Sequence, residues 1–382
     1  MMVLGLISGT SHDAVDACVV DFVPDGETLH GRVVEHTAVP YPATLRRRLV
    51  EALPPARVPM AEVCALDTFI GQHFAEVAAD LTDRHPVDLI CSHGQTVFHW
   101  VEGPRALGTL QLGQHAWVAE RTGVPVIGDV RAADIAAGGH GAPLVPILDT
   151  LLMAGRDVTV AALNLGGIAN MTVLPVGASP HAYDLGPANA LIDAAVLRLT
   201  GGRESYDRDG RYAAQGRVDA ALLAELLGDP YYELPHPKST GNEHFHAAYL
   251  DERLTGRDVA ALDVVATVTE LTAVVVAADL AKAGAQEVIA SGGGVANPAL
   301  MARIAAASQG VLLRTTDELG APSDVKEAIA FALIGYLSAH ALPGNVPSCT
   351  GASGPRVLGT ISAGGGPARH AHAQMPTRVV LG

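Results

Sequence analysis

The sequence predicts an α/β protein with two related halves, because one strand–turn–strand pattern occurs twice and a further glycine-rich turn follows. In the first copy, apolar runs flank a turn of small and polar residues at 8–13. In the second copy, apolar runs flank a similar turn at 164–170. The third turn, at 291–298, separates a short apolar run from a helical pattern. Strand pairs combined with helices indicate mixed α/β domains, and the repeated strand pair indicates two halves of common design.

The spacing of apolar residues predicts the remaining elements in order. In the first half it predicts strands at 33–39, 87–91 and 124–127 and helices at 43–52, 60–82 and 116–122. The glycine- and proline-containing segment at 138–143 separates this half from the second, which starts near residue 157. The second half adds helices after residue 189, at 264–280 and at 299–307, and a polar loop around 238–245 that suits a lid or substrate loop.

Composition limits the classes of function. The chain has 382 residues, of which 49% are hydrophobic, so it can bury a large core, and two domains are expected. Its formal net charge of -15 is spread along the sequence, which argues against a nucleic-acid partner. The four cysteines form no Cys-x-x-Cys pair, so buried reduced thiols are expected and zinc is not.

A cytoplasmic location without membrane attachment is also expected. The first apolar run has no basic segment before it, and Asp13 and Asp16 interrupt it, so it does not resemble a signal peptide. The most apolar later stretch, at 264–280, carries Glu270 and Asp279. These two acids favour a helix packed inside the protein over a membrane span.

The turn at 8–13 suits phosphate binding. Gly5 and Gly9 allow close approach of the backbone to a ligand, and Thr10 and Ser11 supply N–H and hydroxyl donors. Asp13 adds a carboxylate that suits water-mediated Mg²⁺. Ordinary turn chemistry is the alternative, because any hairpin can carry Gly, Ser and Asp.

The motifs argue against two other nucleotide-binding classes. A P-loop needs a lysine after its second glycine, and the chain's three lysines, Lys238, Lys282 and Lys326, lie in other contexts. The turn at 291–298 does not match Gly-x-Gly-x-x-Gly, so a nicotinamide-dependent enzyme is not expected.

Polar residues beyond predicted strands supply the remaining candidates. Thr96 follows the strand at 87–91, and Arg131 and Asp134 follow the strand at 124–127, where ligand-binding side chains commonly lie. Asp184 precedes a Gly-Pro pair and a helix, so it is either a functional carboxylate or a helix N-cap. Glu327 lies one helical turn beyond Ser323, and it either faces a ligand together with Ser323 or faces solvent.

Taken in order, these segments resemble the anhydro-N-acetylmuramic acid kinases, within the superfamily of sugar kinases, chaperone ATPases and actin. The resemblance runs from Leu4 to about Gly359. It implies two actin-like (ribonuclease H-like) domains flanking a nucleotide cleft. The implied domains are 1–130 with a return at about 335–362, and 131–334 with an insertion at about 203–250. The remaining tail at 363–382 is rich in Gly, Ala and His and has no apolar period, so it is expected to be flexible. The matching blocks are 9–16, 92–99, 119–123, 131–134, 164–170, 186–190, 238–241, 243–245, 291–295, 322–324 and 326–328.

The resemblance also implies an ATP- and Mg²⁺-dependent homodimeric enzyme of peptidoglycan recycling that acts on 1,6-anhydro-N-acetylmuramic acid. Water would open the anhydro bridge, with Asp184 as base, while the 6-oxygen takes the γ-phosphate. Asp13 would hold the metal, and the sugar would contact Thr96, Arg131, Asp134 and Glu327. The implied nucleotide contacts are Gly9, Thr10, Ser11, His12, Asp13, Ala14, Val15, Asp16, Asn164, Gly166, Gly167, Gly292, Gly293, Gly294 and Asn297.

Several residues depart from those usual in the family. His12 and Ala14 lie in the first turn, His140 lies in the glycine-rich linker, and Leu185 directly follows Asp184. Gln114 and His115 also differ from a usual Asp-Gly pair. Such changes bear on sugar contacts, so a kinase of another anhydro sugar, such as levoglucosan, is one alternative. A non-catalytic actin-type nucleotide switch is another, and the presence of Asp184 argues against it.

Overall fold

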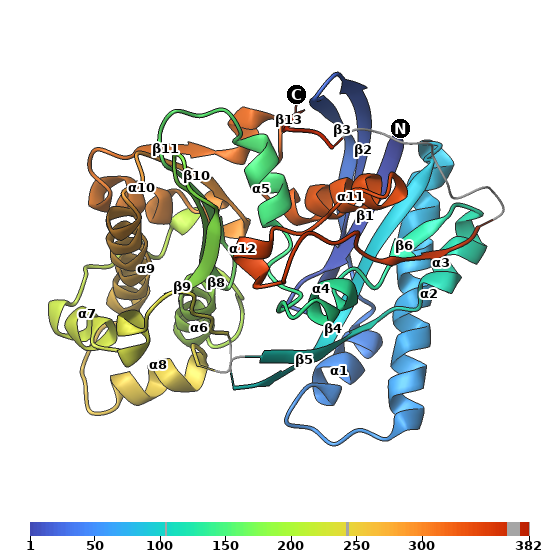
Figure 1. Cartoon of the computed structure of the whole chain (residues 1–382). Helices are drawn as coiled ribbons and strands as arrows, with labels where there is room; N and C mark the ends of the chain where they lie inside the picture. The colour runs from blue at the N-terminus through green and yellow to red at the C-terminus, as the bar shows by residue number, and fades with distance from the viewer. Residues whose placement is uncertain (104, 242–243, 365–374, 382) are drawn as a thin grey trace. The chain divides into compact units, whose positions relative to one another are not determined.

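The computed structural model describes residues 1–103, 105–241, 244–364 and 375–381 (Figure 1). The chain divides into two compact units. The first contains Met1–Gly155, Leu319–Ala321 and the chain from Val325 onward. The second contains Arg156–Glu318 and Pro322–Asp324.

The first unit is built on a mixed sheet. β1 (Met2–Ser8), β2 (Ala14–Asp25) and β3 (Thr28–Pro40) form an antiparallel meander. β4 (Leu89–Glu102) lies parallel to β1 on its other side, and β6 (Val126–Gly128) lies parallel to β4. β5 (Arg105–Leu112), β12 (Thr360–Ser362) and β13 (Arg378–Leu381) complete the sheet.

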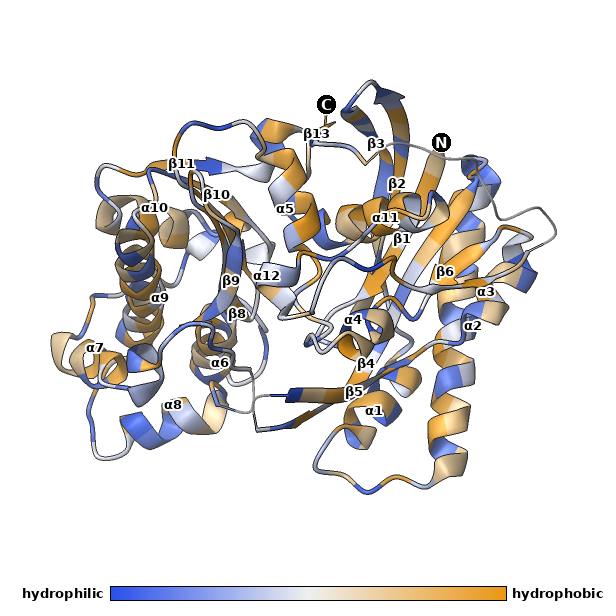
Figure 2. Cartoon of the chain, viewed as in Figure 1, coloured by the Kyte–Doolittle hydropathy of each residue, from blue (hydrophilic) through white to orange (hydrophobic). Residues whose placement is uncertain are grey.

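Side chains that alternate along β1 fill two different cores of this unit. Leu4 and Leu6 pack in a cluster with α1 (Ala43–Ala52), α2 (Met60–Arg84) and α3 (His115–Thr122). Val3 and Ile7 pack in another with α5 (Pro146–Leu152) and α11 (Lys326–Ala339). Figure 2 shows α11 as hydrophobic along most of its length, as a helix buried on nearly all sides requires.

The second unit contains a smaller mixed sheet. β7 (Val160–Leu165), β8 (Ile168–Leu174) and β9 (His181–Pro187) are antiparallel, and β10 (Glu287–Ser291) and β11 (Leu312–Thr315) run parallel to β7. The helices of this unit are α6 (Asn189–Thr200), α7 (Ala220–Leu227), α8 (Ala247–Leu254), α9 (Ala261–Ala283) and α10 (Pro298–Ala307). Within the described residues, α9 alone is long and apolar enough to cross a membrane, but 61% of its most apolar window is buried in the protein.

The two sheets share one topology. Their central orders are β3-β2-β1-β4-β6 and β9-β8-β7-β10-β11, with the same pattern of antiparallel and parallel pairs. This order is that of the ribonuclease H-like domains of actin-like proteins. The fold expected from the sequence, two related actin-like α/β domains, is confirmed.

The observed boundaries differ from the expected ones. The first unit extends to Gly155 rather than 130, because Val130, Leu144 and Leu148 belong to its core. It also takes all of α11 rather than a return at about 335. The expected insertion at 203–250 contains α7, the short helix η2 (Pro230–Glu233) and the start of α8; residues 242 and 243 lie outside the described residues.

The expectation of a flexible tail at 363–382 is wrong for residues 378–381. They form β13, which pairs in parallel with the edge strand β3. Val379 and Leu381 are buried in the first unit, at 1% and 5% exposure. The burial of alternate residues explains the strand, although four residues are too few to show a clear period in the sequence. Residues 365–374 and 382 lie outside the described residues.

Candidate active site

The turn between β1 and β2 exposes the groups expected to meet phosphate. Thr10, Ser11 and Asp13 are exposed, and the Ser11 hydroxyl donates a hydrogen bond to the Asp13 carboxylate. The Asp13 carbonyl accepts from the Tyr41 N–H at 2.9 Å, and the His12 carbonyl accepts from Arg46 Nε at 3.0 Å. These contacts fix the backbone of the turn, while Thr10, Ser11 and the Asp13 carboxylate remain exposed.

The residues around this turn have different environments. His12 is half-buried, and burial lowers the pKa of its imidazole. Ala14 and Asp16 are half-buried, whereas the Val15 side chain is fully buried in the core, so only its backbone is available to a ligand. A Cβ on Gly9 would meet open space, in agreement with close approach of a ligand.

Gly5 has a different role from the one expected. A Cβ at this position would lie 2.0 Å from the Ala328 carbonyl oxygen of α11. Gly5 is therefore required for close packing of α11 on β1, and it does not face a ligand.

Gln95 supports the first turn, a role that its sequence position did not predict. Its fully buried side chain accepts from the Ser8 hydroxyl at 2.7 Å and from the Tyr41 hydroxyl at 3.3 Å, and donates to the Gly9 carbonyl at 3.2 Å. The neighbouring Thr96 is half-buried, and its hydroxyl accepts from Gln111 Nε2 at 3.0 Å. The sequence signal for Gln95 was the polar run at 92–99, because polar residues are not expected in a buried strand unless they have hydrogen-bond partners there.

The half-buried Arg131 pairs with the buried His93. Arg131 donates to His93 Nε2 at 2.8 Å and to the Gly141 carbonyl at 2.6 Å. Because guanidinium can only donate, Nε2 is an acceptor, and the proton on Nδ1 is donated to the Gly94 carbonyl at 2.9 Å. Burial and the Arg131 charge hold the pKa of His93 well below its usual value, while burial lowers the pKa of Arg131 to about 10. Arg131 therefore stays charged at neutral pH beside a neutral imidazole.

Asp134 is part of the scaffold around Arg131 and does not face a sugar. It is fully buried and accepts hydrogen bonds from the Gly141 N–H, Asn345 Nδ2 and the Thr350 hydroxyl, at 2.8, 2.6 and 2.7 Å. These donors occupy both carboxylate oxygens. Asp134 thereby fixes Gly141, whose carbonyl accepts from Arg131.

Glu327 lies in the first turn of α11 and is half-buried. Burial raises the pKa of its carboxyl, and the Arg131 charge opposes the rise. Ser323 does not share this helix, since α11 begins at Lys326. Instead, the Ser323 carbonyl accepts from the Gly292 N–H at 2.7 Å in the second unit. The expectation that both side chains face one ligand from one helix is therefore wrong.

The turn between β7 and β8 presents backbone N–H groups. The carbonyls of Gly166 and Gly167 accept from the N–H groups of Asn189 and Ala188, at 3.0 and 2.9 Å, at the start of α6. In a trans peptide the N–H points opposite to the carbonyl, so the N–H groups of Gly167 and Ile168 point away from α6. Such paired donors suit a phosphate.

The third glycine turn packs directly on the end of β7. A Cβ on Gly292 would lie 2.5 Å from Asn164 Oδ1, and one on Gly294 would lie 2.7 Å from Leu165 Cβ, whereas Gly293 faces open space. The Asn297 side chain is buried and caps α10 by accepting from the Leu300 N–H at 3.1 Å. Asn297 therefore shapes the turn through its cap.

Asp184 lies within β9 and is not a helix cap, because the N-cap of α6 is Ala188. A β-bulge falls beside Asp184, next to its pairing with Asn170. Its half-buried carboxylate accepts from the Thr240 N–H at 3.0 Å. Bulges are frequent beside active sites, where they aim a side chain.

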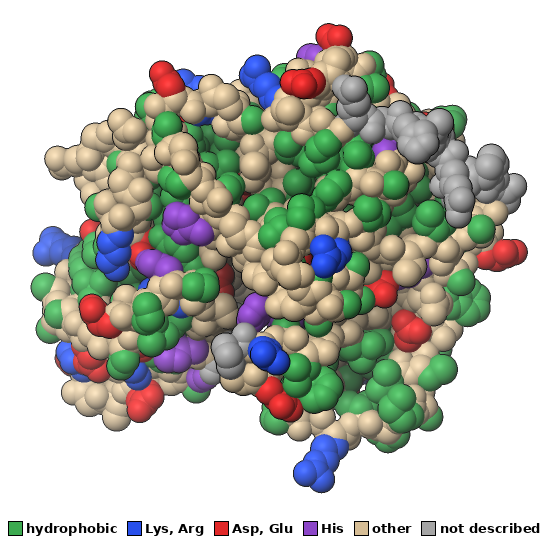
Figure 3. Space-filling view, in the orientation of Figure 1, with side chains coloured by type: hydrophobic (Ala, Val, Ile, Leu, Met, Phe, Trp, Pro, Cys, Tyr) green, Lys and Arg blue, Asp and Glu red, His purple; other side chains and the backbone are tan. Residues whose placement is uncertain are grey.

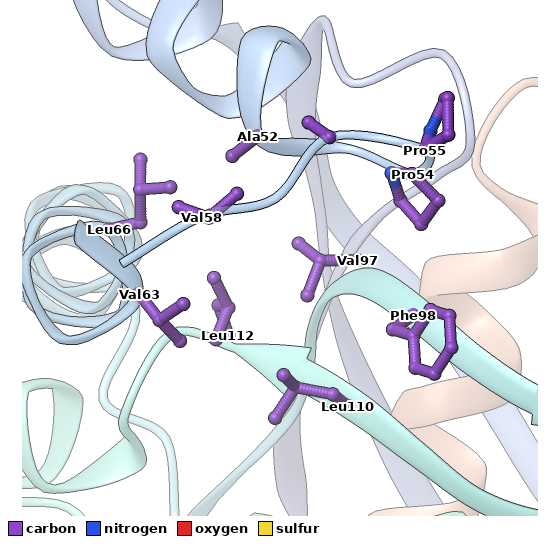
Figure 4. Close-up of a pocket in the computed structure, with 11 residues that line it drawn as sticks. Ala52, Pro54, Pro55, Val58, Val63, Leu66, Val97, Phe98, Leu110 and Leu112 are labelled. Atoms are coloured by element: carbon purple, nitrogen blue, oxygen red, sulfur yellow. The ribbon is translucent and has the colours of Figure 1, made fainter. Parts of the chain in front are cut away.

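An apolar cavity lies in the first unit, beside the part of β4 that follows Thr96. It measures about 370 Å³, and its lining residues, shown in Figure 4, come from α1, the α1–α2 connection, α2, β4 and β5. All of them are apolar, so it does not suit a nucleotide or a sugar. Within the described part of the chain, no three metal-binding side chains gather. Figure 3 shows acidic and basic side chains scattered over the visible face.

Comparisons with known proteins give matches over nearly the whole chain. The profile of the family "Anhydro-N-acetylmuramic acid kinase" matches residues 1–364. The protein of that name from Streptomyces coelicolor is 52% identical over 373 residues, covering 97% of this chain and 95% of its own. The one from Rhodococcus erythropolis is 49% identical, covering 95% and 94%.

A solved structure, component A of Acidaminococcus fermentans (R)-2-hydroxyglutaryl-CoA dehydratase, superposes with a TM-score of 0.45 at 12% identity, covering 88% of this chain and 98% of its own. The family assignment rests on the sequence relatives. The enzyme class expected from the sequence, a kinase, is confirmed, and the chain belongs to the anhydro-N-acetylmuramic acid kinase family.

Proposed function

We propose that the protein phosphorylates the 6-oxygen of 1,6-anhydro-N-acetylmuramic acid with ATP while water opens the anhydro bridge. The products are N-acetylmuramic acid 6-phosphate and ADP. Family membership over residues 1–364 supports the substrate. The observation that carries the chemistry is Asp184, a half-buried carboxylate on a bulged strand and aimed by the Thr240 N–H.

Asp184 would act as the general base. It takes a proton from water as the water oxygen bonds to the anomeric carbon and the bond from that carbon to the 6-oxygen breaks. The 6-oxygen bonds to the γ-phosphorus as the bond to the ADP oxygen breaks. A positioned base is needed because water is a weak nucleophile. The Thr240 N–H favours the ionised form that a base requires.

The two hairpin turns would bind the phosphates. Thr10 and Ser11 offer exposed donors, and Gly167 and Ile168 offer paired N–H groups. Such donors stabilise the charge that spreads over a transferring phosphoryl group. Asn164, Gly292, Gly293 and Gly294 would shape the nucleoside contact through the third turn.

Asp13 fits a role in holding Mg²⁺. Its exposed carboxylate is oriented by Ser11, and Mg²⁺ keeps several waters and needs few protein ligands. When bound, the metal would neutralise phosphate charge.

Arg131, Glu327 and Thr96 remain the proposed sugar contacts. Arg131 is half-buried and keeps its charge, so it suits the carboxylate of the lactyl group. Asp134 would act on the sugar only through Gly141 and Arg131. We further propose that the enzyme works in the cytoplasm as a homodimer in peptidoglycan recycling, which rests on the family resemblance.

Mass spectrometry of the products formed in ¹⁸O-labelled water tests this function. The wild-type protein, with Mg·ATP and the anhydro sugar, should give a 6-phosphate with the label at the anomeric hydroxyl. Asp184→Asn should lose at least ~10²-fold in turnover, since a general base contributes about 10²–10⁴-fold, while nucleotide binding is retained.

Other results would contradict one part of this proposal each. A phosphorylated product without label would exclude coupled ring opening. No product from this sugar but turnover of levoglucosan would change the substrate. ATP binding without phosphorylation of either sugar would favour a nucleotide switch, and full activity of Asp184→Asn would overturn the role of that residue.

A further inference from the structure

Lys238 is a buried cation with no carboxylate within ion-pairing distance among the described residues. Its exposure is 6%, and Nζ donates to the carbonyls of Tyr231 and Tyr232 at 3.3 and 3.4 Å. Nζ also lies 4.6 Å from the centre of the Tyr231 ring. Burial lowers the pKa of the amine. Burying a cation costs free energy, and hydrogen bonds to carbonyls and contact with an aromatic face offset this cost.

Lys238 and Tyr231 also hold the backbone of Asp184, one at its N–H and the other at its carbonyl. The Tyr231 hydroxyl donates to the Asp184 carbonyl at 2.8 Å, and the Asp184 N–H donates to the Lys238 carbonyl at 3.0 Å. Two residues beyond Lys238, the Thr240 N–H reaches the carboxylate of Asp184. The contacts form a closed ring from Asp184 to Tyr231, to Lys238 and back to Asp184.

The position of β9 explains why such a ring is needed. β9 is the edge strand of its sheet, so the outward N–H and carbonyl of Asp184 have no neighbouring strand. The segment 238–240 takes that place, and the Lys238 amine ties this segment to η2, which carries Tyr231. A strand edge that would otherwise be mobile is fixed at the one carboxylate that the reaction needs.

We propose that Lys238 and Tyr231 are positioning residues that aim the Asp184 carboxylate. The inference rests on the proposed function of Asp184 as base. Neither residue needs to touch the sugar or the nucleotide, since both act through the backbone of Asp184 and through Thr240. Their loss should therefore change the chemical step and leave nucleotide affinity intact.

The chain offers matched controls for both residues. Tyr231→Phe removes the hydroxyl that reaches Asp184, while Tyr232→Phe removes a neighbouring buried hydroxyl that has no partner within the described structure. Lys238→Met removes the buried amine, while Lys282→Met removes an exposed amine on α9.

Activity is the first readout. In Tyr231→Phe, kcat should fall about 10-fold or more, toward the ~10²-fold that a 1 Å misplacement costs, with KM for ATP unchanged. The acidic limb of the kcat–pH profile should move to higher pH, because a looser Asp184 backbone weakens the hydrogen bond from the Thr240 N–H to the ionised carboxylate. Lys238→Met should behave likewise, and the two controls should match wild type.

Amide hydrogen exchange is the second readout, and it does not depend on turnover. In Tyr231→Phe, the Asp184 and Thr240 amides should exchange at least ~10-fold faster than in Tyr232→Phe, while the amides of β7 stay protected. Unchanged exchange would overturn the positioning role, whether or not the anhydro sugar is the substrate. Equal loss of kcat in Tyr231→Phe and Tyr232→Phe would also overturn it. Faster exchange in a protein whose wild type does not turn over the sugar would support the positioning role and reject the proposed substrate.

Discussion

Asp193 on α6 is a half-buried carboxylate beside Asp207, which is itself buried. Burial, together with the Asp207 charge, raises the pKa of Asp193 from 3.8 to about 7. The folded state therefore binds a proton that the unfolded state has released between about pH 4 and 7. Folding stability should fall as the pH rises through this window and level off above it, because the charged form is then imposed on the folded state.

Asp193→Asn should remove this penalty. We expect the free energy of unfolding to rise by about 2 kcal/mol at pH 8 and to change little at pH 4. The value at pH 8 is the pKa shift converted at ~1.4 kcal/mol per pKa unit and then reduced because Asp193 is partly exposed. Urea unfolding at both pH values measures this. Asp258→Asn, at an exposed aspartate, is the control and should be neutral. A gain that is the same at both pH values would contradict the titration of Asp193.

At the level of single residues, the sequence located the polar positions better than it assigned their roles. Asp134 and Asn297 lie beside the expected turns, but one holds Gly141 and the other caps a helix. A carboxylate that binds a ligand and one that binds the backbone have the same local sequence signal, and only the partners distinguish them. Two of the three donors to the Asp134 carboxylate, Asn345 and Thr350, lie 211 and 216 residues away, beyond the reach of any local pattern.

Among the elements, the packing of α11 on β1 depends on Gly5. Gly5→Ala would place a methyl group against backbone atoms of Ala328 and Ala332, which cannot move aside as a side chain can. We expect a loss of about 3 kcal/mol in the free energy of unfolding, as in overpacked cores. Gly9→Ala, four residues along, meets open space and should stay within ~0.5 kcal/mol. Thermal unfolding of both variants tests the contrast, and equal midpoints would refute it.

Most helices and strands could be predicted because their apolar period is long or sharply bounded. The helix predicted at 43–52 matches α1, and the one predicted at 60–82 ends two residues short of the end of α2 at Arg84. β5 was not predicted, since its alternation is weak and Leu107 and Leu110 are exposed. Its position depends on pairing with β4, and the local pattern of apolar residues does not reveal that pairing.

For the molecule as a whole, β13 contributes to the stability of the first unit, although it lies beyond the residues that match the family profile. Removing the chain after residue 377 would expose the edge of β3 and delete the buried side chains of Val379 and Leu381. We expect a loss of about 2–3 kcal/mol, as each fully buried aliphatic side chain contributes about 1.5–3 kcal/mol before correction for residual burial in the unfolded chain. Urea unfolding measures it, with Arg378→Ala as a control at an exposed position. Unchanged stability of the shortened chain would show that β13 does not stabilise the first unit.

The membership of α11 in the first unit has a consequence for synthesis. The ribosome makes residues 156–318 before it makes Lys326–Ala339, so the second unit has its complete sheet and helices while one face of the first sheet still lacks its central helix. Domains fold as units once their residues have emerged. The half of the protein that is translated first is therefore the half that completes its folding last, and until then Val3, Ile7 and Val20 remain without the helix that covers them.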